Sequence, residues 1–146
     1  MTESVIVTEH SSGEWLIGQL TLNVEKTLNS LTREMVDVIT DQLAHWAANE
    51  RVVAVLIDGA GEKAFCAGAD LEEMGSNLSG ARGEMKKDPE GAKAELFKSV
   101  YKLNKLFRDL EVCGKPIAAA LNGLALGGGF EFVMACTGRF IASDNK

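Results

Sequence analysis

The sequence predicts a single domain with an α/β fold and a mainly parallel sheet. One observation indicates the fold class, and two indicate a single domain. Short apolar segments rich in β-branched residues alternate with longer segments whose apolar residues recur every three or four positions. No internal repeat and no linker divides the chain. Its 146 residues are enough for a single domain with a core of its own.

The expected strands are apolar runs bounded by polar or glycine-rich residues. Residues 14–22 form the first, and a polar connector follows over residues 23–30. Val52–Asp58 is a continuous β-branched run, which is typical of a strand buried on both faces in a parallel sheet. Pro116–Leu121 and Arg139–Ser143 complete the expected strands.

Two long helices are predicted from apolar stripes. The first runs from an N-cap at Thr32 to Asn49, with Glu34 favourably placed in its first turn. Its stripe consists of Met35, Ile39, Leu43 and Trp46. The second helix spans Ala92–Leu110, with a stripe of Leu96, Val100, Leu103, Phe107 and Leu110. That stripe is heptad-like but too short for a convincing coiled coil, so we expect the helix to pack on the sheet.

Two further segments are distinguished by their glycines, one in a polar stretch and one before an apolar stretch. Gly75 to Gly91 is polar and rich in Gly, Ser and charge, so we expect a mobile surface excursion. Gly127-Gly128-Gly129 is expected to open a short helix from Phe130 to Cys136 that is apolar almost all round and therefore buried.

Composition excludes several classes of function. A net charge of −6 argues against a general nucleic-acid binder, although a few local basic residues can still hold a polyanionic ligand. The three cysteines lack paired spacing, which argues for a reducing compartment, and the absence of a Cys/His cluster argues against a metal site. We find neither a signal peptide nor a membrane-spanning run, and we expect a cytoplasmic protein.

The segment Leu126-Gly-Gly-Gly-Phe-Glu131 presents backbone amides. Its glycines allow close approach to the chain, and the first amides of a helix lack intrahelical partners. An oxyanion or phosphate is stabilised at such a place. The glycine spacing matches neither the dinucleotide fingerprint nor the P-loop, and glycines needed only for tight packing remain an alternative.

Glu131 favours a functional role for this segment over glycines needed only for packing. It lies three residues after Gly128, on the same face of the expected helix. Burial among apolar neighbours would disfavour its charged form, which suits a general acid/base. The alternative is a glutamate that only complements the helix dipole.

A second amide-presenting turn is Phe65-Cys66-Ala67-Gly68-Ala69-Asp70. Small residues directly after an expected buried strand expose the backbone, and Asp70 is placed to cap a helical turn. Two such turns fit an oxyanion hole with one donor from each.

These segments carry a family resemblance. Lys63–Leu71 and Asn122–Glu131 together resemble the two signature segments of the crotonase (enoyl-CoA hydratase/isomerase) superfamily. Lys115–Ala120 is similar to the strand that precedes the second segment in that family, and the resemblance covers the chain from Trp15 onward.

The resemblance implies a crotonase-like β/β/α-spiral fold, a homotrimer or dimer of trimers, and acyl-CoA or enoyl-CoA substrates, with no cofactor beyond the CoA moiety. It places the amides of Ala69 and Gly128 in the oxyanion hole and makes Glu131 a catalytic glutamate. The implied CoA-contacting residues are Lys26, Ala67 and Asp70. For Lys26, the alternative remains open that it is an ordinary solvated lysine without a role in CoA binding.

The activity we expect is 2-enoyl-CoA hydration in fatty-acid β-oxidation, in a free-standing hydratase or in the hydratase module of a multifunctional subunit. Hydratases have a second catalytic glutamate, which would fall beyond Lys146. We therefore expect residues 1–146 to be the N-terminal part of a single crotonase-like domain, C-terminally incomplete and without its closing helices. An isomerase or another crotonase reaction is one alternative, and an acyl-CoA-binding or assembly fragment without catalysis is another.

Overall fold

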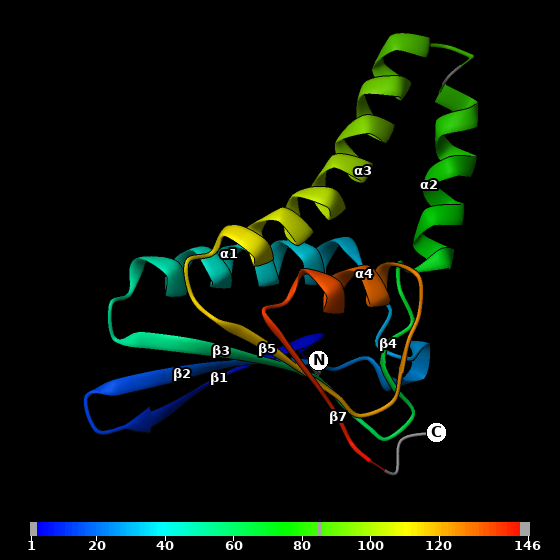
Figure 1. Cartoon of the computed structure of the whole chain (residues 1–146). Helices are drawn as coiled ribbons and strands as arrows, with labels where there is room; N and C mark the ends of the chain where they lie inside the picture. Colours follow the sequence, from blue (N-terminus) through cyan, green and yellow to red (C-terminus); the bar gives the residue numbers. More distant parts are fainter. Residues whose placement is uncertain (1–2, 85, 144–146) are drawn as a thin grey trace.

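The computed structural model describes residues 3–84 and 86–143, and the chain end at Lys146 lies outside them. A five-stranded sheet has helices over one face, and a pair of helices projects away from it (Figure 1). In spatial order the strands are β1 (Val5–Ser12), β2 (Trp15–Leu22), β3 (Val52–Gly59), β5 (Ile117–Leu121) and β7 (Gly138–Ile141). Every neighbouring pair is parallel except β1–β2, which confirms the predicted α/β class and mainly parallel pairing.

Two smaller groups of elements complete the fold. A second sheet pairs β4 (Ala64–Cys66) with β6 (Leu124–Ala125) in parallel. The helices are η1 (Glu25–Thr27), α1 (Arg33–Ala48), α2 (Leu71–Glu84), α3 (Pro89–Val112) and α4 (Gly128–Ala135). Among the described residues, no helix combines the length and apolar character needed to cross a membrane.

Helix α1 covers the main sheet as the sequence predicts. The Thr32 hydroxyl accepts a hydrogen bond from the Met35 amide at 3.2 Å, so Thr32 is the N-cap. Trp46 is fully buried against β2, where a Cβ on Gly18 would lie 2.7 Å from the indole ring. The Trp46 indole N–H donates to Glu9 on β1 at 2.8 Å, which ties the helix to the edge strand.

Strand β1 was missed by the sequence analysis. Its signal is the β-branched start of Val5–Ser12, and its pairing with β2 over eight residues makes it the edge of the sheet. The expectation that β3 is buried on both faces was wrong in part, because Val53 is 41% exposed. Helices cover one face of the sheet, so a continuous apolar run does not imply two covered faces here.

The polar segment expected as a mobile surface excursion projects from the sheet, but it is helical, which the sequence did not predict. It forms α2 and the first turn of α3, and these two helices lie side by side as a hairpin (Figure 1). A Cβ on Gly75 or Gly80 would meet nothing within 4 Å, so no close contact requires these glycines. The helix forms despite them because Asp70 caps its start and α3 packs along it.

Helix α3 packs on helices rather than directly on the sheet. It contacts α1, α2 and α4, and its C-terminal half buries Leu106 and Leu110. In its N-terminal half, Leu96 and Val100 remain exposed. The predicted stripe therefore has two environments, and packing on the sheet was the wrong interpretation.

Candidate active site

The first amide-presenting turn leads out of β4. Gly68 has φ of 99°, and a Cβ there would lie 2.8 Å from the Leu126 carbonyl oxygen and 3.1 Å from the Gly128 nitrogen. A side chain at this position would thus be strained and would press on the second turn. Glycine is required at position 68 because the backbones of the two turns meet there.

The second turn opens α4 from the other side of this contact. The Leu126 amide donates to the Cys66 carbonyl at 3.0 Å, and a Cβ on Gly129 would lie only 2.1 Å from that same oxygen. Gly127 precedes the helix with φ of 51°. Gly129 is therefore needed for close packing and Gly127 for its backbone conformation, and the packing at Gly129 brings the start of α4 against the residues after β4.

Ala69 and Gly128 lie beside each other as a result. A Cβ built on Gly128 would lie 3.6 Å from the Ala69 nitrogen. Within residues 3–84 and 86–143, neither of these two amides donates a hydrogen bond. The Gly128 amide also sits at the positive end of the α4 dipole. Chemically, such a pair of unused donors suits an oxygen that gains negative charge.

The residues after η1 hold the first turn in place. The Leu31 amide donates to the Gly68 carbonyl at 2.7 Å, and the Asp70 amide donates to the Leu31 carbonyl at 3.0 Å, so Leu31 and Ala69 form a parallel bridge. These bonds leave the Ala69 amide between two tethered neighbours. The Ala67 amide is fixed in the same way, by a 2.9 Å bond to the Leu28 carbonyl.

Asn29 anchors this supporting segment and was not singled out from the sequence. Its side chain is buried, accepts from the Val24 amide at 2.9 Å, and donates to the carbonyls of Ala60 and Ala64 at 3.0 and 2.9 Å. Its φ of 56° lies in the left-handed region, which asparagine tolerates better than most residues. An asparagine in a polar connector was the available signal, but its partners are remote in sequence.

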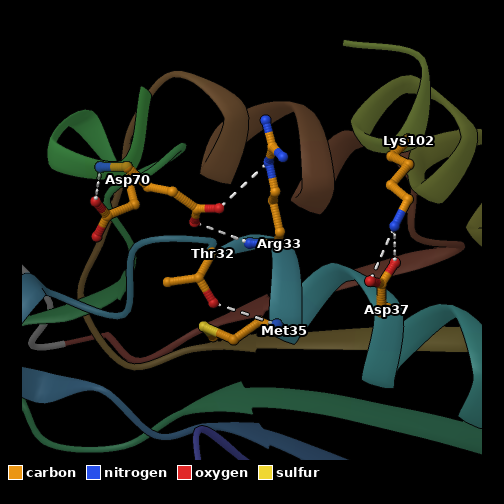
Figure 2. A network of polar contacts seen from close by, with 7 residues as sticks. Thr32, Arg33, Met35, Asp37, Asp70 and Lys102 are labelled. Carbon is orange, nitrogen blue, oxygen red and sulfur yellow. Dashed lines mark hydrogen bonds and ion pairs between the residues drawn. The ribbon is translucent and has the colours of Figure 1, made fainter. Parts of the chain in front are cut away.

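Asp70 takes the capping position that the sequence predicts. Its carboxylate accepts from the Glu73 amide at 2.8 Å and from the Ser30 hydroxyl at 3.0 Å. These bonds, that from Glu73 foremost, hold the pKa of Asp70 below its ordinary value. Figure 2 shows this cap near Thr32 and Arg33, at the start of α1.

Glu131 does not have the surroundings expected of it. It lies in the first turn of α4, where its amide donates to the Gly127 carbonyl at 3.1 Å, but its side chain is exposed. The helix is not buried on all sides, since Phe130 and Met134 are about half exposed. The predicted burial of this carboxylate was therefore wrong for the described residues, because α4 buries one face only.

A cavity of about 730 Å³ adjoins the first turn. Ala69 and Asp70 line it together with residues from the starts of α1 and α2 and from α3. A smaller cavity of about 330 Å³ lies between η1 and the loop after β3, lined by Glu25, Asn29 and Lys63 among others. Lys26 is exposed on η1, and neither it nor Ala67 is among the described residues that line either cavity.

Comparisons with known proteins agree with the two motifs. Residues 17–146 match the family model described as enoyl-CoA hydratase/isomerase. The chain is 38% identical over 132 residues to the short-chain-enoyl-CoA hydratase of Clostridium acetobutylicum, covering 90% of this chain and 45% of that protein. It is also 38% identical over 112 residues to the mitochondrial 3-hydroxyisobutyryl-CoA hydrolase of Bos taurus, covering 77% of this chain and 26% of that protein.

The fold agrees as well. The crystal structure of an enoyl-CoA hydratase from Bacillus anthracis superposes with a TM-score of 0.75 at 30% identity, covering 98% of this chain and 49% of that one. The chain thus spans less than half the length of each of these relatives. The matching family model, the identities and the shared fold show that the chain belongs to the enoyl-CoA hydratase/isomerase, or crotonase, family of enzymes.

Proposed function

We propose that residues 1–146 form the oxyanion-hole part of a single crotonase-like domain that hydrates 2-enoyl-CoA thioesters in fatty-acid β-oxidation. The observation that carries this proposal is the adjacency of the Ala69 and Gly128 amides, neither of which donates a hydrogen bond within the described residues. The thioester carbonyl oxygen would accept from both amides. Their donation draws electron density toward that oxygen and leaves C3 of the enoyl group open to attack by water.

Glu131 is the proposed acid/base group. It follows the Gly128 amide by one helical turn, so a carboxylate on that face lies close to a thioester bound at the amide. Its role would be to take a proton from the attacking water or to deliver one to the enolate. Its exposure in this chain leaves it accessible to both.

The proposal also covers CoA and assembly. Lys26, Ala67 and Asp70 are the proposed CoA contacts, and Lys26 and Ala67 lie on the segments that the Leu28–Ala67 hydrogen bond joins. A homotrimer, or a dimer of trimers, is the proposed assembly. It is supported by the large apolar side chains that stay exposed on α4 and β7, namely Phe130, Met134, Phe140 and Ile141.

Crotonyl-CoA hydration, followed as loss of the enoyl-thioester absorbance, tests the activity. In the whole protein, Glu131→Gln is expected to lower the rate by about 10²–10⁴-fold while the affinity for crotonyl-CoA changes little. Glu34→Gln is the matched control, because Glu34 is also an exposed first-turn glutamate, on α1. Unchanged turnover in Glu131→Gln would refute the role of that residue.

Thioester hydrolysis is a second candidate, favoured by the identity to a protein named as a 3-hydroxyisobutyryl-CoA hydrolase. The same two amides would serve it, but water would attack the carbonyl carbon instead of C3. The product separates the two reactions, because hydrolysis releases the free thiol of CoA and hydration does not. A thiol-reactive dye added to the same assay measures that release.

A further inference from the structure

The cavity beside Ala69 is a long groove rather than a compact pocket. Its floor comes from the start of α1, where Leu31 and Val36 are buried, and its wall from α3. The α3 residues that line it run from Gly91 to Asn104, a span of about 20 Å at the helical rise of about 1.5 Å per residue. One end of the groove therefore meets the proposed oxyanion hole, and the other lies well along α3.

Much of the α3 wall of the groove is apolar. Five aliphatic residues of α3 line the groove, namely Ala92, Ala94, Leu96, Val100 and Leu103. Leu96 and Val100 are the residues of the predicted stripe that the protein core leaves uncovered. An apolar ligand group lying along them would remove this surface from water.

Several charged residues at the rim of the groove are held by ion pairs. Lys102 binds Asp37 of α1 at 2.8 Å, and Arg33 lies 3.4 Å from Glu73. Figure 2 shows both Arg33 and Lys102 turned toward acidic partners. Glu84 lies 3.6 Å from Lys87, and Asp88 accepts the Gly91 amide as the cap of α3. Asp70 and Asp88 also line the groove and have no basic partner among the ion pairs of the described residues. The groove therefore combines hydrophobic surface with a rim that has more acidic than basic side chains, which disfavours an anionic chain and suits an uncharged one.

The volume indicates how long that chain is. A methylene is similar in size to a water molecule, whose share of liquid volume is about 30 Å³. A four-carbon acyl group would therefore fill only about a sixth of the roughly 730 Å³ available. Each further methylene buried along α3 adds apolar contact until the groove is filled.

We infer that this groove selects linear, uncharged acyl groups longer than butenoyl, and that Val100 and Leu96 on α3 are specificity-determining residues. The inference rests on the proposed function, since Ala69 must bind the thioester for the acyl chain to enter the groove. It goes further than that function by naming the preferred substrate class.

Binding of butyryl-CoA, octanoyl-CoA and lauroyl-CoA, measured by isothermal titration, tests the inference on the whole protein. Affinity is expected to rise by about fourfold for each added methylene between butyryl-CoA and octanoyl-CoA. Val100→Trp fills the groove with an indole, and we expect it to lower the affinity for lauroyl-CoA by about tenfold or more while leaving that for butyryl-CoA unchanged.

Val112→Trp is the matched control. Val112 is also on α3 and is 54% exposed, against 55% for Val100, but it does not line the groove as described. The Val112→Trp variant should bind all three acyl-CoAs with the same affinities as the parent protein. Equal affinity for the three acyl-CoAs in the parent protein, or an equal loss for butyryl-CoA and lauroyl-CoA in Val100→Trp, would overturn the inference while leaving the proposed function intact. Failure to bind any acyl-CoA would overturn both.

Discussion

A Cβ atom on Gly128 would point at the backbone nitrogen of Ala69, at a distance of 3.6 Å. The two residues are remote in the sequence and come from different turns, one after β4 and the other at the start of α4. Their adjacency depends on glycine at the contact points and on the segment that tethers the first turn. Each of these dependences can be tested separately.

Gly129→Ala should destabilise the protein. The added methyl would lie 2.1 Å from the Cys66 carbonyl oxygen, so the two turns must move apart. Overpacking of this kind costs about 1–3 kcal/mol in the free energy of unfolding. Chemical denaturation followed by circular dichroism measures the loss, with Gly75→Ala as the control because a Cβ there meets nothing within 4 Å. Equal stability of the two variants would contradict the packing described.

Asn29→Ala should destabilise the protein through lost hydrogen bonds. The substitution leaves the Val24 amide and two carbonyls without their buried partner, at about 1–3 kcal/mol for each group left unsatisfied. Asn29→Gly separates this effect from backbone strain, because glycine accepts the φ of 56° without a side chain. Denaturant midpoints should fall for both variants, and further for alanine. A normal midpoint for Asn29→Gly would show that the hydrogen bonds matter little.

The sequence predicted the elements whose signals are local. The stripe and cap of α1 are contained in residues 32–49, and the glycines at both turns indicated close backbone approach. Helix α2 escaped prediction because its stability depends on the Asp70 cap and on α3 rather than on its own composition. The exposure of Glu131 and the groove along α3 depend on which helix faces stay uncovered, and a single helix's pattern does not specify that.

Asp70→Ala should lower stability at neutral pH and matter less in acid. Loss of the cap costs about 0.5–2 kcal/mol. The pKa of Asp70 lies below its ordinary value of 3.8 in the folded protein, so its ionised form contributes stability above that value and the contribution is lost as pH falls through the folded pKa. Unfolding curves at pH 7 and at stepwise lower pH should therefore converge for the two proteins. A constant difference at every pH would contradict this account.

The three thiols should differ in reactivity. Burial raises the pKa of Cys66 to about 11 and that of Cys136 to about 12, whereas Cys113 is only half-buried. Because the thiolate is the reactive form, iodoacetamide at pH 8 should label Cys113 first in the native protein. Peptide mass spectrometry reads the positions, and the protein unfolded in guanidinium should react at all three. Labelling of Cys66 as fast as Cys113 would show that its burial is incomplete.

The central claim is that the amides of Ala69 and Gly128 together polarise an acyl thioester, and Gly128→Ala tests it most directly. The methyl meets the Ala69 nitrogen at ordinary contact distance, so the fold should survive. We expect the same methyl to crowd the space beside the Ala69 amide, where the proposed thioester oxygen would accept its hydrogen bonds. The measurement is the infrared carbonyl stretch of ¹³C-labelled butyryl-CoA bound to the protein and to the variant. We predict a shift to lower wavenumber with the parent protein and the loss of most of that shift in Gly128→Ala, whereas an equal shift in both, or none with the bound ligand in either, would contradict the account.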